Sequence, residues 1–141
     1  MIEENLDNSI VLLTLEACKT ISEREKQWNA DFDLRHKGRL ESAIGSVNLK
    51  SQLIGLEVLD IAAAYFVHIA CGHVFVDGNK RFSVTFMVYF LELNKLKLKL
   101  TKNALRNLAI KICHERNKDV PIHIRRDYIR DVLKENILPL I

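Results

Sequence analysis

The chain has 141 residues, of which 48% are apolar and 28% charged, a balance that is typical of a globular protein and excludes an intrinsically disordered one. This length fits one domain over residues 1–141, with a hydrophobic core that needs no disulfide or metal ion to hold it. The net charge of +3 comes from 21 basic and 18 acidic residues. That excess is too small to indicate a nucleic acid or an anionic membrane as a partner.

Four helices are predicted in the first two thirds of the chain. Apolar residues at helical spacing predict the first over about residues 7–28 and a short second over residues 38–47. The third, at about residues 56–71, and the fourth, at about residues 79–94, are apolar on almost every face. Such helices are typical of the buried centre of a protein.

The last third predicts a short extended segment and two more helices. The stretch LKLKL (residues 96–100) alternates with period two, and Thr101 is expected to cap a fifth helix over about residues 102–116. Pro121 suits the first turn of a sixth helix that ends near Asn136. Four apolar residues of this helix are expected to face inward and three arginines to face water: Ile122, Ile129, Val132 and Leu133 inward, and Arg125, Arg126 and Arg130 outward. The predicted class is therefore all-α, with about six helices.

The stretch HVFVDGNKRF (residues 73–82) lies between the two central helices and concentrates polar side chains there. A loop held at both ends by rigid helices keeps its polar groups in position. Phe75, in the middle of this loop, is expected to insert its ring into the core. The alternative interpretation is an ordinary capped helix start with solvated charges.

Four consecutive residues of this stretch are suited to phosphate. Gly78 allows a positive φ or a close approach of the backbone to a ligand. Asn79, Lys80 and Arg81 begin the fourth helix, where backbone N–H groups and the positive end of the helix dipole attract phosphate. Lysine and arginine add positive charge at the same place.

Asp77 and His73 complete the predicted site. Asp77 would oppose phosphate unless a cation lay between them, and Mg²⁺ commonly binds carboxylates together with substrate phosphates. His73 is the residue of this stretch that can accept a proton at neutral pH. The set predicts a nucleotide and Mg²⁺ site with a general base beside it.

Seven positions of this stretch resemble the motif of the Fic/Doc family, H-x-F-x-[D/E]-[A/G]-N-[G/K]-R, and the similarity extends over about residues 36–95. The matching residues are His73, Phe75, Asp77, Gly78, Asn79, Lys80 and Arg81. The resemblance implies an all-α Fic fold with the motif in a loop that leads into a central helix. It also implies that His73 is the general base for a target hydroxyl, that Asp77 holds Mg²⁺, that residues 78–81 contact the nucleotide phosphates, and that Phe75 is structural.

Two positions are more similar to the death-on-curing (Doc) toxins than to the AMP-transferring Fic enzymes. Lys80 stands where those enzymes usually have glycine, and Val84 stands where they carry a second arginine. Similarity to Doc implies a kinase that uses ATP and Mg²⁺ to phosphorylate a Ser or Thr hydroxyl of elongation factor Tu or a similar protein. It also implies a Phd-like antitoxin that restrains the toxin. Cys71 departs from the Doc pattern, which tends to have arginine two residues before the motif histidine.

Other interpretations stay open. Within the enzyme class, the chain could transfer a nucleotide monophosphate, as Fic enzymes do. The alternative of a different class is an inactive Fic-fold module that binds or regulates a partner. A zinc site could form from histidines and cysteines, although their spacing is irregular for one: His68, Cys71, His73, Cys113 and His114. The arginines of the sixth helix could bind nucleic acid, but acidic residues alternate with them and favour a solvated face.

The three cysteines are widely spaced and indicate no disulfide framework. A reducing cytoplasm is therefore the expected location. The N-terminal stretch MIEENLDNSI is acidic and polar, unlike a signal peptide, and no uncharged apolar run reaches the ~18 residues that span a bilayer.

Overall fold

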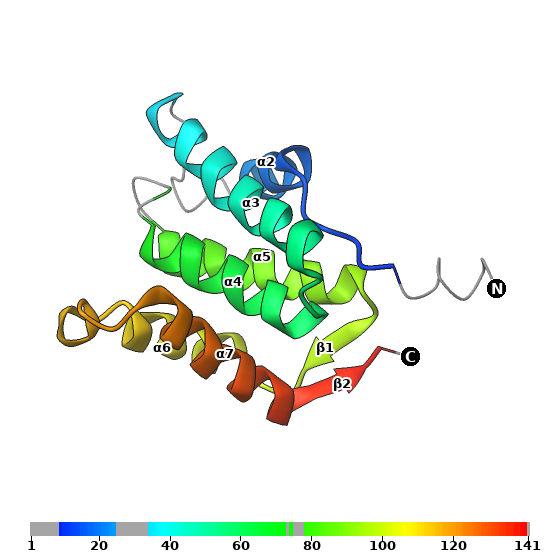
Figure 1. Cartoon of the computed structure of the whole chain (residues 1–141), viewed down its shortest axis with the longest axis vertical. Helices are drawn as coiled ribbons and strands as arrows, with labels where there is room; N and C mark the ends of the chain where they lie inside the picture. The colour runs from blue at the N-terminus through cyan, green and yellow to red at the C-terminus, as the bar shows by residue number, and fades with distance from the viewer. Residues whose placement is uncertain (1–8, 25–33, 73, 75–77, 141) are drawn as a thin grey trace.

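The computed structural model describes residues 9–24, 34–72, 74 and 78–140, with residues 34–37 described by their backbone. The described residues form six α-helices, a 3₁₀ turn and a two-stranded sheet (Figure 1), which confirms the predicted all-α class. The elements are α2 (Leu15–Arg24), α3 (Leu34–Ile54), α4 (Val58–Cys71), α5 (Asn79–Leu93), β1 (Leu96–Leu98), α6 (Lys102–Ile112), the 3₁₀ turn η2 (Glu115–Asn117), α7 (Ile122–Asn136) and β2 (Ile137–Pro139).

Helices α4 and α5 form the centre of the molecule, as their apolar sequences predict (Figure 1). Helix α4 is buried without interruption over residues 61–67, because α3, α5 and α7 each pack on it. The rings of Tyr65 and Phe90 meet edge to face between the two central helices, with centroids 5.0 Å apart. Each fully buried aromatic or aliphatic side chain of this core contributes about 1.5–3 kcal/mol.

A buried hydrogen-bond group attaches the N-terminal segment to the core. The Tyr65 hydroxyl accepts a hydrogen bond from the Leu13 backbone N–H at 3.0 Å and donates one to Oδ1 of Asn48. Nδ2 of Asn48 in turn donates to the Leu13 carbonyl at 2.8 Å. Burial raises the pKa of Tyr65 to about 12, so the hydroxyl stays protonated and remains a donor.

The early helices differ from their predicted bounds. Helix α3 has 21 residues, about twice the length predicted for residues 38–47. It continues through Gly38 and Gly45 and ends before Gly55, whose φ of 64° terminates it. Helix α2 begins only at Leu15, and the side-chain oxygen of Thr14 accepts a hydrogen bond from the Ala17 N–H at 3.1 Å at its start. The last predicted residues of the first helix lie outside the described residues.

The elements after α5 follow the prediction more closely. Strand β1 forms within the alternating stretch and pairs antiparallel with β2, Leu96 opposite Pro139. The sequence did not predict β2, whose run of apolar residues has no alternation. The Thr101 side chain accepts a hydrogen bond from the Ala104 N–H at 3.1 Å and caps α6, as expected. Helix α6 ends at Ile112, earlier than the predicted Arg116.

The prediction that the arginines of α7 face water holds only in part: Arg125 and Arg126 are half-buried, whereas the side chain of Arg130 is 37% exposed. Helix α7 packs on α4, so the flanks of α7 contact neighbouring segments. Arg125 donates from Nε to the Val120 carbonyl at 3.1 Å, and Arg130 forms an ion pair with Asp60 of α4 at 3.2 Å. The inward-facing apolar residues are confirmed, fully buried at Ile129 and Leu133 and half-buried at Ile122 and Val132.

The expectation of no disulfide is also wrong. Cys71, the last residue of α4, is bonded to Cys113, the residue that follows α6, with their Cα atoms 5.4 Å apart. Sequence spacing did not reveal the pair, because only folding brings the ends of α4 and α6 together. The disulfide also removes both cysteines from the suggested zinc site. Cys18 is a free, buried thiol, and burial raises its pKa to about 12.

Within the described ranges, none of the helices combines the length and the apolar character needed to cross a membrane.

Candidate functional site

The predicted site lies where the chain passes from α4 to α5. Gly72 directly follows α4, and a Cβ atom there would lie 2.2 Å from the His68 carbonyl oxygen, so the chain can leave the helix in this way only with glycine. Val74 is 1% exposed and anchors the connection to the core. The sequence predicted an anchor at Phe75 and did not reveal the one at Val74. His73, Phe75 and Asp77 lie outside the described residues, so their roles stay predictions.

Gly78 begins the described part of the motif. Its φ of 81° and ψ of 16° are left-handed, which agrees with the positive φ expected at this glycine. A Cβ atom would lie 3.5 Å from the Phe82 ring, an ordinary contact, so the backbone conformation and not space favours glycine. The Phe82 N–H donates to the Gly78 carbonyl at 2.8 Å and closes the first turn of α5. The helix therefore begins at Asn79, as predicted.

Lys80 and Arg81 lie half-buried in this first turn. The Ser83 hydroxyl donates to the Lys80 carbonyl at 2.6 Å, and the Thr85 hydroxyl donates to the Arg81 carbonyl at 3.1 Å. These bonds hold the backbone that carries the two cations. Because the N-cap residue is a glycine, it offers no side-chain acceptor to the N–H groups of the turn. A helix start with two cationic side chains is suited to an anion such as phosphate.

The residues that directly follow Arg81 in α5 belong to the core. Phe82 and Ser83 are fully buried, and the rings of Phe82 and Phe86 lie 5.7 Å apart. Val84 is only 5% exposed, so its side chain packs among apolar groups. The start of α5 is thus fixed by these buried residues, which hold in place the turn that carries Lys80 and Arg81.

The disulfide adds a constraint that sequence reasoning missed. Cys71 lies two residues before His73, so the bond to Cys113 fixes the start of the motif connection to the end of α6. The available signal was weak: both cysteines fall near the ends of predicted helices, but nothing in the sequence pairs them.

A metal site cannot be built from the described residues alone. No three His, Cys, Asp or Glu side chains in that part of the chain gather closely enough to hold an ion. The predicted Mg²⁺ ligand, Asp77, lies outside it. Lys80 and Arg81 at the helix start do fit the phosphate groups of a nucleotide.

Comparison with known families agrees with this arrangement. The sequence matches the Fic/DOC family over residues 12–91, more than half of the chain. None of the curated proteins compared with the chain is a match. The matched stretch starts beside Leu13, whose backbone is hydrogen-bonded to Tyr65, and ends within α5. It includes α4 and the motif. The chain therefore belongs to the Fic/DOC family.

Proposed function

We propose that this protein is a Fic/DOC-type transferase that moves the γ-phosphate of ATP, with Mg²⁺, to a Ser or Thr hydroxyl of a protein. The observation that carries the proposal is the start of α5, where left-handed Gly78 leads into a buried helix whose first turn presents Lys80 and Arg81. Fic/DOC proteins are generally transferases, and the motif order supports the same chemistry.

Each motif residue has one role in this proposal. The first turn of α5, with Asn79, Lys80 and Arg81, binds the phosphates and offsets the charge of the transferring group. Asp77 holds Mg²⁺, which with ATP supplies an activated phosphoryl group when bound. His73 accepts the proton that the target hydroxyl loses.

Two residues favour phosphate over AMP as the transferred group. AMP transfer places the outer phosphates deep in the pocket at the helix start, where a glycine at position 80 would leave room. The long cationic side chain of Lys80 would fill that space. Val84 is buried in the core and has no charge with which to bind an outer phosphate. Nucleotide bound in the reverse direction presents its γ-phosphate to His73.

Labelled ATP tests the direction of transfer. The protein is incubated with an extract that contains elongation factors, with His73→Ala as the inactive control. The γ-labelled ATP should mark a protein band, and α-labelled ATP should not. The opposite pattern would identify AMP transfer, and no labelling from either would favour an inactive binding module.

We further propose that the protein acts as a toxin, with an elongation factor Tu-like substrate in the cytoplasm and a Phd-like antitoxin as inhibitor. One support is the Doc-like motif. The other is that this sequence has no complete inhibitory motif of the Fic type, [S/T]-x-x-x-E-[G/N], since Asp131 stands at the first position before Glu135 and Asn136. Expression of the chain alone should then stop bacterial growth, and expression of His73→Ala should not. Harmless expression of an active enzyme would contradict the toxin role.

A further inference from the structure

A groove runs between α3 and α7, with α4 as its floor. One part has a volume of about 290 Å³ and includes His68, and a second part of about 140 Å³ extends toward Asp60 and Asp127. Both parts share Lys50, Leu56 and Arg126, so they form one continuous depression. None of its residues belongs to the motif.

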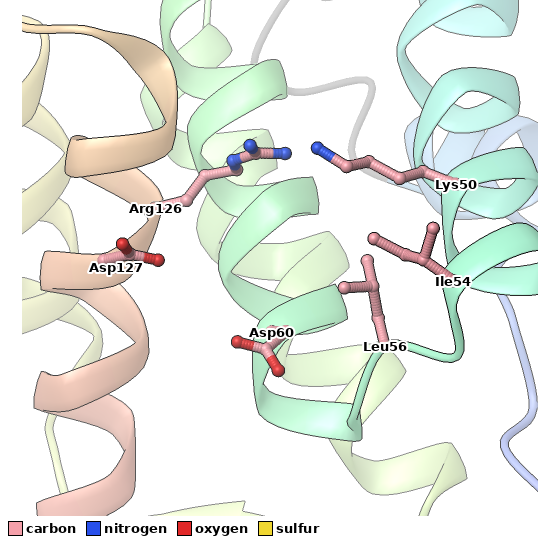
Figure 2. A pocket seen from close by; sticks show the side chains of 6 residues that line it. All are labelled: Lys50, Ile54, Leu56, Asp60, Arg126 and Asp127. Carbon is pink, nitrogen blue, oxygen red and sulfur yellow. The ribbon is translucent and has the colours of Figure 1, made fainter.

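Two cations converge at the middle of this groove. Figure 2 shows Lys50 reaching from α3 and Arg126 reaching from α7, with their charged ends directed toward one another. Within the described part of the chain, neither side chain has an ion pair or a hydrogen bond. Two like charges that converge without an acid between them repel each other, so the folded chain carries an electrostatic cost here.

The two acids that line the groove do not neutralise Lys50 and Arg126, because another arginine pairs with both of them. Arg130 forms ion pairs with Asp60 at 3.2 Å and with Asp127 at 3.4 Å. These two carboxylates are therefore compensated at the far end of the groove. The excess positive charge stays at its middle, on Lys50 and Arg126.

His68 responds to the same excess. It lies half-buried on α4 in the wider part of the groove. Burial is the largest cause that lowers the pKa of His68, and the charges of Arg126 and Lys50 lower this pKa further. The groove thus disfavours a third positive charge and favours a negative one.

The walls around these cations are apolar. Leu56 and Ile54 line the narrower part beside them, and Ile54 is 61% exposed. Val47, Ala64 and Ile122 line the wider part. A free inorganic anion would meet only the two cations and leave these apolar walls in water. A peptide segment can neutralise the cations and cover the walls at the same time.

We propose that this groove binds a segment of a partner protein in which an aspartate or glutamate lies between apolar side chains, with the carboxylate between Lys50 and Arg126. The complementary charge and the apolar walls define the occupant. The proposal stands apart from the proposed reaction and does not depend on it. Charge-assisted hydrogen bonds to both cations should make each of them important for affinity.

A peptide-display selection tests the proposal on the full, oxidised chain. The library contains random peptides of about 12 residues, enough for three helical turns. The Lys50→Gln/Arg126→Gln double variant serves for counter-selection. The matched control is Lys102→Gln/Arg106→Gln, which removes the same two charges from exposed positions of α6. Circular dichroism melts establish that both variants fold.

The selected peptides should share an acidic residue flanked by apolar residues. They should bind the wild type and the α6 control alike, and the groove variant about ten- to hundredfold more weakly. Replacement of the peptide's own Glu by Gln should cause a similar loss, which keeps the test decisive even if the groove variant unfolds. Selection of peptides without an acidic residue, or equal binding to the groove variant, would overturn the proposal.

Two further measurements separate other occupants. Inorganic phosphate is titrated by calorimetry, and phosphate binding that the groove variant loses, with no acidic peptide selected, would assign the groove to a free anion. Sedimentation analysis follows association of the chain with itself. A dimer that the groove variant abolishes would assign the groove to a second copy. Either result would overturn the partner proposal.

Discussion

The start of α5 and the groove between α3 and α7 are both positively charged, but they are built in different ways. At the start of α5, Gly78, Lys80 and Arg81 are neighbours in the sequence, and the helix itself positions them. In the groove, Lys50 and Arg126 are far apart in the sequence and come together only because α3 and α7 pack on α4. The geometry of a contiguous motif is set by local structure, whereas the charge of the groove depends on which helices pack together.

The largest expected effect is a loss of transfer activity in a variant of the motif that leaves peptide binding in the groove unchanged. His73→Ala should lower transfer about 10²–10⁴-fold, because it removes a general base. The circular dichroism spectrum, the melting temperature and the affinity of the groove for its selected peptides should not change. Lys102→Gln/Arg106→Gln should keep its activity. If His73→Ala kept most of the wild-type activity, His73 would not be the general base. If His73→Ala bound the groove peptides more weakly, the two regions would be coupled.

The second prediction concerns the covalent bond at the motif end of α4. Cys71→Ala/Cys113→Ala should lower the free energy of unfolding by about 2–4 kcal/mol, because the unfolded chain loses a crosslink between residues 42 apart. Urea unfolding of the oxidised proteins measures this difference. Reduction of the wild type by dithiothreitol should lower its free energy of unfolding to nearly that of the double variant. Equal unfolding midpoints for the oxidised wild type and the variant would contradict the prediction.

A smaller effect is expected at the proposed metal ligand. Asp77→Asn removes a carboxylate charge and should raise the Mg²⁺ concentration needed for half-maximal activity by at least about tenfold. Activity should partly recover at high Mg²⁺, which a purely structural defect would not do. A Mg²⁺ titration that coincides with that of the wild type would exclude Asp77 as a ligand.

The smallest effect is a pH dependence in the groove. The lowered pKa of His68 means that the folded chain binds this proton less readily than the unfolded chain. Stability should therefore be complete above the ordinary histidine pKa of about 6.5 and should decrease as the pH falls below it. Arg126→Gln should raise the pKa of His68 and reduce this decrease, whereas Arg106→Gln should change neither. An NMR titration of the His68 imidazole measures the shift, and identical curves for the wild type and Arg126→Gln would refute it.

Local signals accounted for much of the fold. The apolar sequences of α4 and α5, the alternation at β1 and the cap at Thr101 depend on neighbouring residues, and each was predicted correctly. The positions of β2 and of the half-buried arginines depend on which segments lie beside them. No pattern within either segment could reveal those neighbours.

The candidate site divides in the same way. The left-handed Gly78 and the helix start at Asn79 followed from the motif. The anchor at Val74 and the bond from Cys71 to Cys113 depend on contacts with the core and with α6, so the sequence did not show them. The sequence shows the two cations of the groove, Lys50 and Arg126, but not their partners. Only the structure shows that Asp60 and Asp127 form ion pairs with Arg130 and not with these two cations.

The disulfide between Cys71 and Cys113 also closes a covalent ring of the chain, and residues 73–81 lie within that ring. A protease that cuts the oxidised chain once between residues 72 and 112 would leave the two pieces joined. The cut would become visible on a denaturing gel only after reduction. An undivided band on a non-reducing gel therefore does not show that the segment proposed to carry out the reaction is whole.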